Sequence, residues 1–179
     1  MGIFEVRMIR KINWKIILLQ VIGVFLLSKG VERIYLVSII DIYEAVMLGD
    51  FDRVDELTDI PLGELIIYEV VWKLVGIGVG TLLVILRNWL SKISFWNSSI
   101  VIVLTLVLFW SEQYLFNWIN WIVNSIGYLF TEDMKLATFI NGCYLILAGV
   151  ILIFLKDFKK QKSLEQNEPL DHRVSLEEN

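Results

Sequence analysis

The sequence predicts an all-α integral membrane protein, a four-helix bundle with additional amphipathic helices at the membrane interface. Hydrophobic residues make up 56% of the 179-residue chain, and apolar runs long enough to cross a bilayer recur along it. About 20 helical residues, rising 1.5 Å each, span the roughly 30 Å hydrocarbon layer. The seven tryptophans also fit this class, because tryptophan side chains anchor helices at the boundary between membrane and water.

We expect one domain, 14–156, with four membrane spans. The spans lie at about 14–31, 62–87, 98–116 and 136–155. A basic segment, 1–13, precedes the first span. The polar segment 157–179 is predicted to be a disordered tail, because its composition cannot form a core. Within the first span, Gln20 is expected to make a hydrogen bond to another helix.

The segment 31–48 permits two interpretations. Ionisable residues interrupt its apolar pattern, and this pattern fits an amphipathic helix on the membrane surface. The alternative is a tilted continuation of the first span. The acidic stretch 50–59 that follows lacks the ordered spacing of a calcium-binding loop, so it is predicted to be a solvated loop.

The second span carries charged and small residues on one helical face. At about 100° per residue, the members of this face fall within about 60° of one another; they are Glu69, Lys73, Gly76, Gly80 and Arg87. Glu69 and Lys73 are four residues apart and could neutralise each other, and the two glycines would let another helix approach closely. We therefore predict that this face lies inside a helical bundle, away from lipid.

Two further sets of residues extend this prediction. Gly142 and Gly149, seven residues apart in the fourth span, predict a second packing seam. Polar residues from three spans are expected at a similar depth in the outward half of the membrane, and they form a polar intramembrane cluster of Glu69, Lys73, Glu112, Gln113 and Asn141. This cluster could hold the helices together, line an outward-open cavity for a polar species, or meet another subunit.

The basic residues predict the orientation of the chain. Cytoplasmic loops are rich in Lys and Arg. The more basic side of the four-span arrangement holds Arg7, Arg10, Lys11, Lys15, Arg87, Lys92, Lys156, Lys159, Lys160 and Lys162. Both termini are therefore expected in the cytoplasm, with a bacterial inner membrane as the default location. The expected partners are the lipid bilayer and other membrane subunits or further copies of the chain, and nothing indicates nucleic acid.

The sequence does not point to a cofactor, a metal or catalytic residues. Cys143 is the only cysteine and His172 the only histidine. One chain therefore cannot form a disulfide, a cysteine-based metal site or a haem site with two histidine ligands.

Three functions remain open. The first is an accessory or scaffold subunit of a larger inner-membrane complex, which would pack through the face of Glu69, Lys73, Gly76 and Gly80. The alternative is an oligomeric transporter or ion-conducting protein that uses the polar layer of the outward half. A third hypothesis is a membrane-embedded enzyme acting on a lipid-linked substrate, but the chain has no nucleophile elbow and no HExxH motif.

Overall fold

The computed structural model describes the backbone of residues 12–115 and 125–166 and the side chains of residues 12–111 and 125–155. All regular structure within these ranges is helical. The elements are α1 (Trp14–Leu48), α2 (Phe51–Leu57), α3 (Leu62–Leu90), α4 (Phe95–Leu115), the 3-10 helix η1 (Gly127–Leu129) and α6 (Met134–Gln166). Most of the basic segment 1–13, the tryptophan-rich stretch 116–124 and the end of the polar tail, 167–179, lie outside the described residues.

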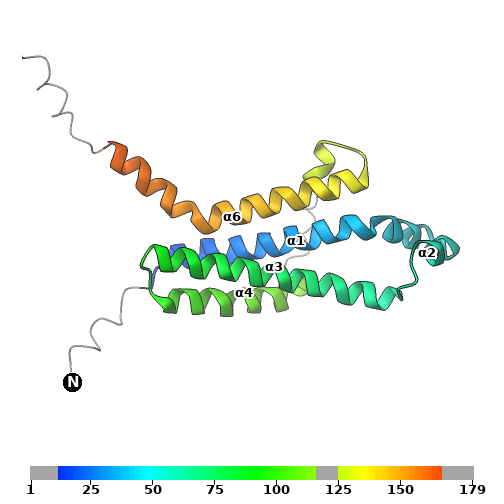
Figure 1. Ribbon diagram of the computed structural model, residues 1–179, viewed down its shortest axis with the longest axis horizontal. Helices are drawn as coiled ribbons and strands as arrows, with labels where there is room; N and C mark the ends of the chain where they lie inside the picture. The colour runs from blue at the N-terminus through cyan, green and yellow to red at the C-terminus, as the bar shows by residue number, and fades with distance from the viewer. Residues whose placement is uncertain (1–11, 116–124, 167–179) are drawn as a thin grey trace, which may run out of the picture.

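Helix α1 is the centre of the fold. Figure 1 shows it between α6 on one side and the hairpin of α3 and α4 on the other, and it contacts all three helices. The α3–α4 loop lies at one end of the molecule, beside the start of α1, and α2 lies at the other end. The helix begins after Asn13, whose side-chain oxygen accepts a hydrogen bond from the N–H of Ile16. It ends at Gly49, whose φ of 73° is a left-handed conformation that glycine adopts without strain.

The second half of α1 decides between the two interpretations of the segment 31–48. The separate surface helix is wrong, because α1 runs through 31–48 without a break. The physical reason is that neither glycine nor proline interrupts this segment before Gly49, and its residues Leu36, Ile39 and Ala45 are buried. With 35 residues, α1 is about 52 Å long, which exceeds the roughly 30 Å thickness of a hydrocarbon layer.

Two apolar clusters stabilise the bundle at different positions along α1. The cluster toward the α3–α4 loop joins α1, α3, α4 and α6 and consists of Ile17, Val21, Val24, Ile77, Val84, Val101 and Ile153. The cluster toward α2 joins α1, α2 and α3 and consists of Leu36, Ile39, Ile42, Ala45, Val54 and Leu65. Each cluster removes apolar side chains from contact with the surroundings of the bundle, and charged residues lie between the two.

Glycines allow α1 to approach both of its long neighbours at backbone distance. On the α6 side, a Cβ atom added at Gly149 would lie 2.6 Å from the carbonyl oxygen of Gly23, and one at Gly142 would lie 2.7 Å from the Ile34 side chain. On the α3 side, a Cβ at Gly76 would lie 2.6 Å from the Cα of Ser28. Gly80 is in the same position opposite Val24, at 2.8 Å. All four glycines singled out in the sequence therefore lie in helix contacts within this chain.

The remaining differences from the predicted boundaries concern short segments. The acidic stretch 50–59 contains a helix, α2, which is capped by the Asp50 side chain and buries Val54. Helix α4 begins at Phe95 rather than at residue 98. Helix α6 continues to Gln166, into the predicted tail, where lysine, glutamine and glutamate residues are good helix formers.

We expect Gly149→Ala to lower the free energy of unfolding by about 1–3 kcal/mol, because its new methyl group would meet the backbone of α1. The matched control is Gly78→Ala, because nothing lies within 4 Å of a Cβ atom added at Gly78. Unfolding of the purified protein in mild detergent, followed by far-UV circular dichroism, measures both variants. Equal stability of the two variants would contradict the close contact between α1 and α6.

Candidate ion-pair site

The site is built around the carboxylate of Glu32, which lies in the middle of α1. Its side chain is only 3% exposed. The Lys29 ammonium, three residues earlier on the same helix, lies 3.1 Å from the carboxylate, and the Lys73 ammonium of α3 lies 3.4 Å from it. A buried carboxylate is stable only where cations compensate the loss of its hydration. Glu32 therefore fixes the position of α3 relative to α1.

Lys73 is held by its surroundings as well as by Glu32. Its ammonium lies 5.8 Å from the centroid of the Phe109 ring of α4, a cation–π distance. The Ser28 hydroxyl donates a hydrogen bond to the Lys73 carbonyl oxygen at 2.8 Å. This contact between α1 and the α3 backbone is possible because Gly76, one turn further along, has no side chain. The site thus joins α1, α3 and α4.

Glu69 and Lys73 do not neutralise each other, which corrects the predicted pair. The Glu69 carboxylate instead accepts a hydrogen bond from the Tyr43 hydroxyl at 3.0 Å, while Lys73 pairs with Glu32. The reason is tertiary: α1 presents a more deeply buried carboxylate to Lys73 than the neighbouring turn of α3 does. Near these two contacts, Tyr35 stacks on Trp72 with 5.9 Å between the ring centroids.

The other members of the predicted polar cluster are not joined to this site by any contact that the structure describes. Glu112 and Gln113 lie on α4, but their side chains are outside the described residues. Asn141 is buried on α6, and its side-chain oxygen accepts a hydrogen bond from the N–H of Gly127 at 2.7 Å. This bond attaches η1 to α6 and gives Asn141 a structural role.

A second buried polar cluster lies toward the α3–α4 loop. The sequence predicts only one of its contacts, the hydrogen bond of Gln20 to another helix. Gln20 of α1 donates a hydrogen bond to the Asn88 side-chain oxygen at 2.8 Å, so its predicted bond to another helix is confirmed. Asn88 in turn donates to the Ser98 hydroxyl of α4 at 2.9 Å. Arg87 is 1% exposed and donates to Asn88 at 3.1 Å. Three helices are therefore linked at this end as well.

Sequence reasoning missed Lys29 and Glu32 as members of the site. The pattern places Glu32 at the start of a surface helix, and Lys29 counts only as a flanking charge. Their spacing of three residues is the one available signal, since such residues lie on the same helical face. Which helix covers that face depends on tertiary packing, and the period of the sequence does not contain that information.

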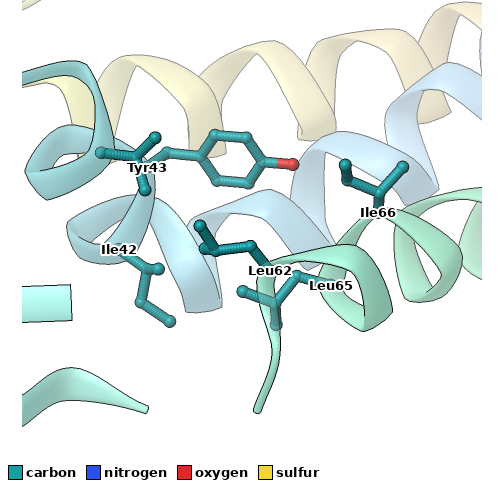
Figure 2. Close-up of a pocket in the computed structure, with 6 residues that line it drawn as sticks. Ile42, Tyr43, Leu62, Leu65 and Ile66 are labelled. Atoms are coloured by element: carbon teal, nitrogen blue, oxygen red, sulfur yellow. The ribbon is translucent and has the colours of Figure 1, made fainter. Parts of the chain in front are cut away.

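The cavities near the site are apolar. One of about 320 Å³ is lined by Val31, Ile34, Tyr35, Ser38, Trp72 and Ile146. Another, of about 150 Å³, lies nearer α2, and Figure 2 shows Ile42 and Tyr43 of α1 beside Leu62, Leu65 and Ile66 of α3. Among the described residues, no three of the types His, Cys, Asp and Glu gather where they could hold a metal ion, and Cys143 is a free, half-buried thiol.

The helices indicate the class of the protein. Within the described part of the chain, three helices are long and apolar enough to cross a membrane: α1, α3 and residues Met134–Leu155 of α6. The apolar part of α4, Phe95–Ser111, is shorter. These helices suggest a helical membrane protein.

Comparison of the chain with protein families, with curated proteins and with solved structures finds no match.

We expect Glu32→Gln to lower the free energy of unfolding by about 3 kcal/mol, because it removes the charge that compensates two buried or half-buried ammonium groups. Thermal unfolding in mild detergent at neutral pH measures this loss. The matched control is Glu69→Gln, which keeps an oxygen that accepts the Tyr43 hydrogen bond and should cost less than about 1 kcal/mol. If both substitutions cost the same, Glu32 is not the centre of the site.

Proposed function

We propose that this protein is an accessory or scaffold subunit of a larger complex in a bacterial inner membrane. In this proposal, α1, α3, α4 and α6 are its four spans, and both termini lie in the cytoplasm. The basic residues of the full sequence support this orientation, because ten of them fall on the side of the α3–α4 loop and four, Lys29, Arg33, Arg53 and Lys135, fall on the other, and cytoplasmic ends are rich in basic residues. The α2 end would then face outward.

The surface available to a partner is the face of α3 that points away from α1. Gly76 and Gly80 contact α1, and Lys73 pairs with Glu32, so the face that the sequence assigns to a partner is already used inside the chain. The opposite face, called the outward face of α3 below, is apolar and exposed, and it consists of Ile67, Val71, Leu74, Gly78, Leu82 and Ile85.

Gly78 is the observation that carries the proposal. It lies in the middle of the outward face of α3, and the space above it is open. A glycine in a helix interior costs about 1 kcal/mol relative to alanine. Within the described part of the chain, no neighbouring helix uses the close approach that Gly78 allows. A helix from a partner could pack there at short distance, as helices do on small residues in membranes.

We expect a photo-crosslinking amino acid at position 82, whose leucine is 67% exposed, to capture a membrane protein from intact cells. The same amino acid at position 147 of α6 is the control, because Leu147 is also exposed, at 63%, but lies on another helix. Mass spectrometry of the crosslinked bands identifies the captured proteins.

The second arm of this test is Gly78→Leu, which fills the gap on the outward face without a clash inside the chain. We expect about tenfold less of the crosslinked partner to copurify with this variant in mild detergent, which corresponds to a loss of about 1.4 kcal/mol in binding free energy. Its circular dichroism should be unchanged. Equal recovery of the partner with Gly78→Leu, or equal capture at positions 82 and 147, would count against the outward face as an interface.

Ion conduction by an oligomer is the second candidate, and one observation favours it. A carboxylate buried between two ammonium groups is a costly arrangement inside a helical bundle, and such groups in membrane proteins often mark ion or proton pathways. If the protein conducts ions, Glu32→Gln should abolish proteoliposome flux while Glu69→Gln leaves most of it. Flux that is equal in the two variants, or absent from the wild type, argues against this candidate.

A further inference from the structure

Arg33 is a cation that the contacts of the bundle leave unused. It follows Glu32 on α1, and its side chain is half-buried. The Nε atom is enclosed and has no hydrogen-bond acceptor, and Arg33 forms no ion pair with any part of the chain that the structure describes. A half-buried guanidinium in a membrane protein is costly without an anion, and such side chains almost always pair.

The nearby carboxylates already have other partners. Glu32 is shared by Lys29 and Lys73. Asp41, two turns further along α1, pairs with Lys135 of α6 at 2.9 Å. Glu69 accepts the Tyr43 hydroxyl. An anion for Arg33 must therefore come from outside the described residues.

The depth of Arg33 follows from exposed tryptophans on the outside of the bundle. Toward the α3–α4 loop, Trp89 and Trp96 are 74% and 60% exposed; toward α2, Trp72 and Trp110 are 42% and 81% exposed. The helical rise separates Trp72 from Trp89 by about 26 Å and Trp96 from Trp110 by about 21 Å. Two aromatic belts at this separation fit the boundaries of a hydrocarbon layer about 30 Å thick.

Arg33 lies at the belt nearer α2. Its neighbour Glu32 pairs with Lys73, which follows Trp72 directly, and Tyr35 stacks on the Trp72 ring. Phospholipid phosphates lie at this level of a bilayer. The long arginine side chain can also extend toward the headgroups while its methylene groups stay against the helix.

We propose that Arg33 binds the phosphate of an anionic phospholipid in the leaflet at the α2 end. The planar guanidinium offers parallel N–H donors on its two terminal nitrogens, which match two phosphate oxygens, whereas the Nε atom is enclosed and takes no part in the contact. This inference rests on the membrane-spanning arrangement in the proposed function, but it does not require a protein partner.

The experiment measures lipid that stays with the protein. The full chain is reconstituted in vesicles of phosphatidylcholine and phosphatidylglycerol, extracted in mild detergent and examined by native mass spectrometry. We expect the wild type to retain phosphatidylglycerol and Arg33→Gln to retain about tenfold less, since a charge-assisted hydrogen bond is lost. Arg33→Lys should retain an intermediate amount, because an ammonium cannot form the bidentate contact. Arg53→Gln is the matched control, since Arg53 is an exposed arginine on α2.

Several outcomes would overturn the proposal. Equal retention by the wild type and Arg33→Gln would do so, as would an equal loss in Arg53→Gln. A third is that inorganic phosphate raises the thermal stability of the delipidated wild type but not of Arg33→Gln, while neither protein retains phosphatidylglycerol. This result would assign the site to free phosphate. Loss of a crosslinked protein in Arg33→Gln with lipid retention unchanged would assign Arg33 to a partner's carboxylate. Failure of the crosslinking at position 82 leaves the lipid measurement unaffected, so the two proposals fail independently.

Discussion

The close approach of α1 to its neighbours is the constraint on which the rest of this structure depends. Gly23 and Gly149 bring the backbones of α1 and α6 together, and Gly76 lets Ser28 reach the backbone of α3. At this short separation the Lys73 ammonium lies 3.4 Å from Glu32, the carboxylate of another helix. In the membrane arrangement that we propose, the hydrophobic effect would contribute little to the association of helices, so such packing and polar contacts would be the main sources of stability.

The charges of α1 and α3 are arranged around this contact in a fixed order. Glu32 takes two cations, Glu69 takes a hydroxyl, and Arg33 is left without an anion in the described part of the chain. The two acidic side chains therefore have different roles even though both lie near Lys73. Polar groups that contact neighbouring helices hold the bundle together, and the proposals for a partner and for a lipid concern groups on its outside.

The sequence was sufficient for the helical class and for which glycines pack, because apolar run length and small-residue spacing are local properties. It was insufficient for the pairing of charges. The four-residue spacing of Glu69 and Lys73 predicts a bridge within one helix, and Tyr43 and Glu32 replace it only because α1 continues past Val31 and lies beside α3. The segment 31–48 has a pattern that fits a surface helix equally well, and its packing face is defined by α2, α3 and α6, which periodicity cannot locate.

The division of the apolar core into two clusters has a consequence for how the protein opens. The cluster with Val54 and Leu65 is joined to the one with Val24 and Val84 through α1 and α3, with the charged residues between them. Local opening costs less where fewer apolar contacts are lost. Amide hydrogens of α2 and of the first turns of α3 should therefore exchange with solvent deuterium in a separate, faster step than those around Val24, so the α2 end behaves as its own cooperative unit.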